Sequence, residues 1–188
     1  MVSKLCFIGI GNPGAKYNET KHNIGKDWLL KLAASFNTEF ILKEKLHAKV
    51  ATSHNNKIHW IIPLTYVNNS GSTVQKIMRY SNIVPKDIVV FHDDLDLNPG
   101  ETKIKLGGGH GGHNGLKDIF SKVGTKDFYR IRIGIGHPGN KDDVTKWVLN
   151  KFKPKDKTLI EDSYIDFANV FDLICDGKFS EAQLKLHS

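Results

Sequence analysis

Short apolar runs alternate with helix-like repeats along this chain. Residues 4–10 form an apolar run that ends in turn residues, as a short buried strand does. Apolar side chains then recur at three- and four-residue intervals over residues 24–36, which is the spacing of one helix face. The pattern therefore predicts that the fold opens with a strand followed by a helix.

The same alternation continues to the C-terminus. Residues 45–62 are two β-like runs around Asn55 and Asn56, which predicts a hairpin whose second strand ends at Pro63. Strands that alternate with helices indicate one α/β domain over residues 1–188, with a mixed, mostly parallel sheet and helices on both faces. Ligands of such sheets bind at the C-terminal ends of the strands. The further strands are predicted at 88–91, 101–106 and 128–135, and the further helices at about 70–80, 115–123, 142–150 and 156–175.

The charge of the chain adds a polyanionic partner to this picture. The 188 residues carry a net charge of +7, and the sequence pI is about 9.3. Lys103 and Lys105 alternate along one predicted strand, as Arg130 and Arg132 do along another. Charge alone does not establish a nucleic-acid ligand, but paired cations beside a glycine-rich segment are typical of phosphate contacts.

The cysteines and the apolar runs bear on the compartment. Cys6 and Cys175 fall in no spacing typical of a metal site or a disulfide framework, which favours two reduced thiols. The first apolar run is too short for a secretion signal, and no apolar stretch approaches the roughly 20 residues of a membrane span. We expect a cytoplasmic protein with no membrane partner.

The densest candidate site is the segment 107–115, which reads GGGHGGHNG and contains six glycines. Glycine costs roughly 0.5–1 kcal/mol relative to alanine inside a regular element, so this many indicate a close approach of ligand to the backbone. A flexible linker is the alternative, but linkers favour serine over histidine. Strand-like residues precede the segment and helix-like residues follow it. We expect a binding loop between the two elements.

His22 and Asp93 are the candidates for acid–base chemistry. His22 lies in a polar loop before a predicted helix, where an imidazole titrates near its ordinary pKa of about 6.5. Taken alone, His22 fits equally well as a residue that starts a helix. Asp93 follows a buried strand, and a carboxylate there can hold one imidazole nitrogen and leave the other free to take a proton from water.

Two further strand ends carry amides and tyrosines. Asn12 and Tyr17 follow the first strand, where an amide can bond a substrate peptide group and a ring can stack on a base. Asn68 follows a later strand, with Tyr66 beside it, and the same two roles are expected for this pair. For the residues directly after Asn68, a helix N-cap is the simpler interpretation.

Three other chemistries have partial support. GIGNPG at 9–14 satisfies the dinucleotide pattern G-x-G-x-x-G, but Pro13 lies in the loop and no acidic residue ends a second strand about twenty residues later. Zinc or manganese could bind the carboxylates of residues 92–98 together with His110 and His113, whereas the spacing of this segment does not fit a calcium loop. A serine nucleophile lacks the G-x-S-x-G elbow.

A series of motifs carries a resemblance to a known family. GIGNPG, Tyr17, TKHNIG, PLTYVNNSG, HDDLDL, KLGGGHGGHNGL and RIRIGIGHPG follow one another over residues 9–139. In this order they make the chain resemble bacterial peptidyl-tRNA hydrolase. The resemblance implies a monomeric α/β enzyme with a mixed, twisted sheet and no metal or cofactor. Its activity would be hydrolysis of the ester between a peptide and the 3′ end of tRNA, which recycles tRNA from prematurely released peptidyl-tRNA.

The resemblance also implies catalytic roles for matching residues. His22 would be the catalytic base and Asp93 the group that supports it. Asn12 would distinguish blocked from free aminoacyl ends by sensing the peptide amide. Asn68 and Asn114 would bind substrate and position the water or the developing oxyanion.

The remaining roles implied by the resemblance concern the tRNA. Tyr17 and Tyr66 would line the pocket for the tRNA end, and His113 would assist near the cleft. Lys105 and Arg132 would hold a tRNA phosphate between them.

Two positions depart from the family pattern. Val67 stands where methionine is usual, and Asp94 stands where glutamate is common. The valine puts the shape of the peptide pocket in question, because a β-branched side chain is stiff where a thioether adapts. The residues by themselves leave two other functions open, namely an RNA-binding module without turnover and a metal-dependent hydrolase.

Overall fold

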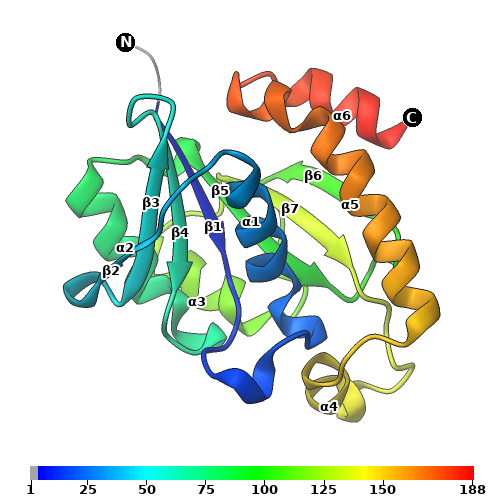
Figure 1. Ribbon diagram of the computed structural model, residues 1–188. Coiled ribbons are helices and arrows are strands. Elements are labelled where there is room, and N and C mark those ends of the chain that lie inside the picture. The colour runs from blue at the N-terminus through cyan, green and yellow to red at the C-terminus, as the bar shows by residue number, and fades with distance from the viewer. Residues whose placement is uncertain (1–3) are drawn as a thin grey trace.

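The computed structural model describes residues 4–188, and seven strands form one sheet at its centre (Figure 1). The strands are β1 (Leu5–Gly9), β2 (Ile41–Lys43), β3 (Ala48–Ser53), β4 (Ile58–Pro63), β5 (Ile88–Asp94), β6 (Thr102–Leu106) and β7 (Tyr129–Gly134). Their order in the sheet is β2-β3-β4-β1-β5-β7-β6. The central strands β4, β1, β5 and β7 run parallel, whereas β2, β3 and β6 join the edges by antiparallel pairing. The expected mixed α/β sheet is confirmed, with its parallel part confined to the centre.

Helices cover both faces of this sheet. α1 (Ile24–Ser35) and α5 (Pro154–Cys175) lie on one face, and α2 (Ser70–Ser81) and α3 (Asn114–Val123) lie on the other (Figure 1). Neighbouring strand residues enter opposite cores: Phe7 packs in the core of the α1–α5 side, and Ile8 packs in the core of the α2–α3 side. Within residues 4–188, none of the helices combines the length and the apolar character that crossing a membrane requires.

The hairpin expected around Asn55 and Asn56 is confirmed, because β3 and β4 pair antiparallel on either side of it. His54, Asn55 and Asn56 have φ values of 53°, 54° and 63°. This left-handed region is one that asparagine and histidine enter more readily than most residues do. The turn chemistry therefore agrees with the strand pattern on either side.

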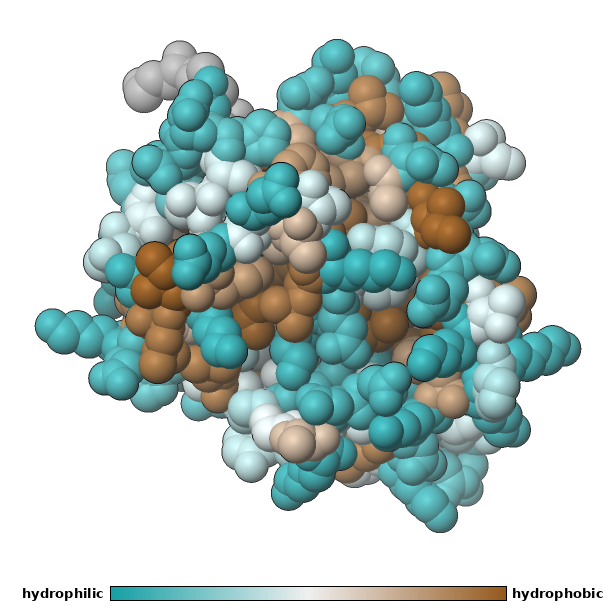
Figure 2. Space-filling view, in the orientation of Figure 1, coloured by the Kyte–Doolittle hydropathy of each residue, from teal (hydrophilic) through white to brown (hydrophobic). Residues whose placement is uncertain are grey.

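Two elements were not expected from the sequence. β2 is a three-residue edge strand that pairs only with β3, and its Ile41 and Leu42 are 58% and 52% exposed. Figure 2 shows hydrophobic residues gathered on this side of an otherwise largely hydrophilic face. The second is α6 (Phe179–His187), which packs against α5 and covers the edge strand β6 (Figure 1).

Side chains of α6 satisfy the free edge of β6. Gln183 Nε2 donates to the Ile104 carbonyl at 3.0 Å, and the Ile104 N–H donates to His187 Nε2 at 3.2 Å. Phe179 stacks on Tyr129 with ring centroids 3.7 Å apart. An exposed strand edge can pair with other chains, and α6 prevents such pairing by covering the edge of β6.

Candidate active site

A cleft of about 580 Å³ opens at the C-terminal ends of the central strands. Its walls come from the segments after β1, β4 and β5, from the glycine-rich loop, from β6 and β7, and from α4 (Val144–Leu149). Polar residues that follow β1, β4 and β5 therefore meet at one edge of the sheet. The candidate residues that line the cleft are Asn12, His22, Tyr66, Asn68, Asp93, Lys105, His113, Asn114 and Arg132.

Asp93 is the buried centre of this cleft. It lies near the end of β5 and is 2% exposed. Its Oδ2 is 2.9 Å from His22 Nδ1, and its Oδ1 is 2.8 Å from His113 Nε2. Burial alone would raise the pKa of Asp93, but the two imidazoles and their hydrogen bonds outweigh burial and hold that pKa well below its ordinary value. Asp93 is therefore an ionised carboxylate that accepts from two imidazoles.

His22 is held by Asp93 through one nitrogen only. It lies in η2 (Lys21–Asn23), the turn directly before α1, and 15% of its side chain is exposed. Because Asp93 is ionised, Nδ1 carries the proton that is donated to Oδ2, and the lone pair is on Nε2. Nε2 makes no hydrogen bond within residues 4–188. Burial lowers the pKa of His22, but the charge and hydrogen bond of Asp93 raise it overall above 6.5. His22 can therefore take a proton from a water in the cleft.

His113 uses both of its nitrogens. It is the N-cap of α3, where its Nδ1 accepts from the N–H of Gly115 at 3.1 Å and of Leu116 at 3.3 Å. The proton of the neutral ring is consequently on Nε2, which donates it to Asp93. A Cβ on Gly115 would lie 2.6 Å from Val67 Cγ1, so glycine is required for this close packing. His113 braces Asp93 and has no lone pair left for a base.

The residues that could bind a metal in the structure differ from those that the sequence suggested. Within residues 4–188, the group whose ligand atoms lie within 4.8 Å of one another is His22, Asp93 and His113, not the set around His110. A metal ion there would have to displace both N–H hydrogen bonds to Asp93.

His92 is a third imidazole near Asp93. It is 1% exposed, and its Nδ1 is 2.8 Å from the Asp93 carbonyl oxygen. Burial is the main reason that the pKa of His92 is lowered to about 3. His92 is therefore neutral near pH 7.

Asn12 is fixed by hydrogen bonds that leave only a donor free. Its Oδ1 accepts from the Val67 N–H at 2.9 Å, so its Nδ2 group is the part that remains for a ligand. Asn23 holds the backbone of Asn12 from both sides: Oδ1 accepts from the N–H at 2.7 Å, and Nδ2 donates to the carbonyl at 3.0 Å. This role of Asn23 was not expected, although the residue stands beside His22 in a polar segment before the helix. Asn12 is therefore suited to bonding a carbonyl oxygen.

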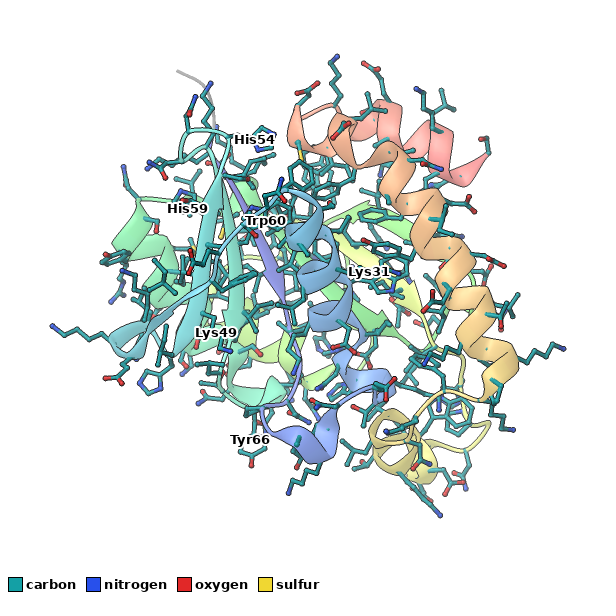
Figure 3. The ribbon with its side chains drawn as sticks, in the orientation of Figure 1. Lys31, Lys49, His54, His59, Trp60 and Tyr66 are labelled. Carbon is teal, nitrogen blue, oxygen red and sulfur yellow. The ribbon has the colours of Figure 1, made fainter. Side chains whose placement is uncertain are left out.

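The other amides and the tyrosines lie around the mouth of the cleft. Asn68 and Asn114 are exposed, and neither side chain makes a hydrogen bond within the described residues. Tyr66 is 53% exposed and lies on the rim beyond the end of β4 (Figure 3). Tyr17 does not line the cleft itself, but its ring meets Tyr66 edge to face at 6.1 Å. The two rings form an exposed aromatic surface beside free amides.

The cations that β6 and β7 bring to the cleft are not equally available. Arg132 Nε donates to Asp94 Oδ2 at 2.7 Å, so much of its charge is neutralised. Lys105 is exposed and has no acidic partner within residues 4–188. In the antiparallel register, Lys105 faces Arg130 and not Arg132. Arg130 is buried, lines the cleft and donates through Nη2 to the Gly107 carbonyl at 2.6 Å. The alternation of Arg130 with Arg132 was visible in the sequence. That Arg130 lies beside Lys105 depends on the register in which β6 pairs with β7.

Comparisons with known proteins give one result over nearly the whole chain. A family model described as peptidyl-tRNA hydrolase matches residues 6–188. Peptidyl-tRNA hydrolase of Delftia acidovorans is 40% identical over 184 residues, covering 97% of this chain and 89% of that protein. The same enzyme of Nitrosomonas eutropha is 43% identical over 185 residues, covering 96% and 94%. The crystal structure of peptidyl-tRNA hydrolase from Acinetobacter baumannii matches with a TM-score of 0.94 at 34% identity, covering 99% of this chain and 95% of that chain.

Proposed function

The chain belongs to the peptidyl-tRNA hydrolase family, and from this premise we propose that His22, oriented by Asp93, is the general base of its reaction. The chain is a hydrolase that acts on the ester bond of peptidyl-tRNA. The observation that carries the proposal is the 2.9 Å bond from His22 Nδ1 to Asp93, which leaves Nε2 free. We propose further that the enzyme works as a monomer in the cytoplasm, where it recycles tRNA from prematurely released peptidyl-tRNA.

The proposed reaction needs one base and one set of amide donors. Water attacks the ester carbonyl carbon while His22 Nε2 takes its proton. The amide groups of Asn68 and Asn114, which line the cleft and make no hydrogen bond to residues 4–188, donate to the developing oxyanion. Collapse of the intermediate breaks the bond to the ribose oxygen, and His22 returns the proton to that oxygen. The products are a peptide carboxylic acid, which loses its proton to solvent, and a free tRNA 3′ end.

The lining of the cleft suits the two halves of this substrate. Leu95, directly after β5, and Val148 and Leu149, in α4, supply apolar side chains. Lys105 in β6 and Arg130 in β7 supply cations. An apolar wall suits peptide side chains, and cations that line the cleft bind phosphates. We therefore place the peptide along α4 and the tRNA backbone beside Lys105.

Asn12 accounts for selection of blocked substrates. Its free Nδ2 donates, so it can bond the carbonyl oxygen of the peptide group that an N-blocked aminoacyl end carries. An unblocked end lacks that carbonyl and brings an ammonium group, which cannot accept a hydrogen bond. A site that leaves a polar group unpaired rejects the wrong ligand strongly. We therefore expect slow cleavage of free aminoacyl-tRNA.

The first test compares N-acetyl-aminoacyl-tRNA with unblocked aminoacyl-tRNA after treatment of the protein with EDTA. Chelated wild type is expected to cleave the blocked substrate selectively, and His22→Ala to lose roughly 10²–10⁴-fold in kcat. His54→Asn is the matched control, because His54 lies in the β3–β4 hairpin at the far end of the sheet (Figure 3) and asparagine tolerates its left-handed backbone. Tight tRNA binding without turnover would leave the binding-module interpretation standing. Recovery of activity only with added divalent ions would establish the metal-dependent alternative.

The phosphate site is tested through salt dependence. Lys105→Gln should weaken tRNA binding and flatten the plot of log Kd against log salt by about 0.7–0.9 for one lost phosphate contact. Arg132→Gln should change the slope less, because Asp94 already pairs with Arg132. Lys31→Gln, on the α1–α5 side of the sheet, is the control (Figure 3). An unchanged slope in Lys105→Gln would place the phosphate elsewhere.

A further inference from the structure

Lys21 is a buried cation next to the base in the sequence. It is 3% exposed, and its Nζ donates to the Lys151 carbonyl at 2.9 Å. The same Nζ lies 4.3 Å from the centroid of the Trp147 ring and 5.4 Å from that of Phe152. No carboxylate lies within ion-pair distance of it among residues 4–188. Lysine is rarely buried unless it is paired, so a carbonyl and two aromatic faces are an unusual set of partners.

Lys21 belongs to η2, the turn that also carries His22, and contacts join this turn to α4 and to the segment after α4. The Lys21 N–H donates to the Asn150 carbonyl at 3.0 Å, and Thr20 forms an isolated antiparallel bridge with Lys151. Trp147, which lies under the ammonium, belongs to α4 itself. One backbone bridge and one buried cation therefore hold the end of α4 beside the turn that carries the base.

α4 is also a wall of the cleft, with an apolar surface. Val144, Thr145, Val148 and Leu149 line the cleft, and Leu149 is 39% exposed. We propose that Lys21 is a positioning residue that sets this wall against the His22 turn, and that the wall holds the peptide part of the substrate. The inference rests on the proposed function, in which His22 attacks the ester and the peptide extends along α4.

A second lysine of the chain provides a matched control. Lys31 Nζ lies 4.1 Å from the centroid of the Tyr164 ring and 3.8 Å from Glu161 Oε2. It joins α1 to α5, and it lies between these helices in Figure 3. Lys31 does not line the cleft that holds His22. Removal of either lysine loses a cation over an aromatic ring, but only Lys21 contacts α4.

The experiment measures kcat and KM for two substrates: tRNA that carries one N-acetylated amino acid, and tRNA that carries an N-acetylated tripeptide. Lys21→Met keeps the unbranched apolar stem without the charge, and Lys21→Arg keeps the charge. Loss of one hydrogen bond to a charged group corresponds to roughly a tenfold to hundredfold change in an equilibrium. We expect Lys21→Met to raise KM for the tripeptide substrate about tenfold, with a smaller rise for the single residue and little change in kcat. Lys21→Arg should restore most of the difference, and Lys31→Met should match wild type.

Two results would overturn the proposal. A drop in kcat by one factor for both substrates, at unchanged KM, would mean that part of the protein is unfolded and that Lys21 only stabilises the fold. An equal rise in KM for both substrates would show that the peptide does not bind along α4. Hydrogen exchange covers a variant that folds poorly: amides of α4 should exchange faster in Lys21→Met than in Lys31→Met, and equal exchange would contradict the proposed anchor. Failure of the proposed function is distinguishable, since it would appear as retained activity in His22→Ala.

Discussion

Two regions of the molecule bring a histidine to Asp93, and they use it differently. The turn before α1 supplies His22, and the glycine-rich loop before α3 supplies His113. Both imidazoles donate to the same carboxylate, at 2.9 and 2.8 Å. The second nitrogen of His113 accepts from two backbone amides, whereas that of His22 makes no hydrogen bond within the described residues.

The second nitrogen therefore decides the role of each ring. A base needs a lone pair that faces the reacting water, and only His22 keeps one. His113 is tied to the start of a helix, which fixes its tautomer and makes it a constant donor to Asp93. Residue type and distance to the carboxylate are nearly equal in the two regions, so neither would separate the base from the brace.

The largest effect in this comparison is expected from Asp93→Asn. An asparagine offers one acceptor and one donor, so it can accept from only one of the two rings. His113 keeps its tautomer because helix amides occupy its Nδ1. The asparagine NH₂ group then faces His22, which must move its proton to Nε2 and loses its basic nitrogen.

We expect kcat of Asp93→Asn to fall roughly 10³–10⁴-fold with the fold retained, as a wrong tautomer does in related triads. Single-turnover hydrolysis measures the loss, and circular dichroism checks the fold. Turnover near that of wild type would break the comparison, since it would show that His22 does not depend on Asp93 for its tautomer.

The next largest effect is expected in the pH dependence that His22 gives to the reaction. Asp93 raises the pKa of His22 above 6.5, so His22 is protonated and inactive on the acid side of that raised value. We expect kcat/KM to fall about tenfold for each pH unit below the raised pKa of His22. An acid limb that persists unchanged in the residual activity of His22→Ala would assign the titration to another group.

Stability should follow the opposite direction over the same range. A pKa that is raised on folding contributes stability that is fully present below the unfolded value of 6.5 and is lost as pH rises through the folded value. His22 therefore favours the folded state most where it is least active. Denaturant unfolding of wild type and His22→Ala across this range measures the difference.

Much of the fold could be predicted from local pattern, because most strands and helices here have a buried face. β2 and α6 could not be predicted in this way, for a physical reason. β2 is three residues long and exists only because β3 pairs with it, and α6 is held by Phe179 against Tyr129 and by side-chain bonds to β6. Both depend on partners distant in the sequence, which a local pattern does not contain.

The site divides in the same way. The sequence indicated that Asp93 ends a buried strand and that His22 lies in a polar segment before a helix. It did not indicate how each polar atom is already used. The side-chain oxygen of Asn12 already accepts from the Val67 N–H, and the charge of Arg132 is already paired with Asp94. These assignments depend on side-chain torsions and on register, which only the folded chain sets.

The smallest effect, and the sharpest test of the brace, is expected from His113→Asn. Asparagine is among the best N-cap residues, so the start of α3 should keep most of its stability, whereas alanine at an N-cap typically costs about 1 kcal/mol. The shorter side chain cannot cap the helix and reach Asp93 together. Asp93 then loses one of its two donors while His22 keeps its tautomer, so kcat should fall about tenfold, which is the lower end of the tenfold to hundredfold range for one lost hydrogen bond to a charged group. Kinetics and urea unfolding of His113→Asn and His113→Ala measure the two effects separately. A loss as large as that of His22→Ala would make His113 a catalytic residue, and the occupied nitrogen would no longer explain the difference between the two regions.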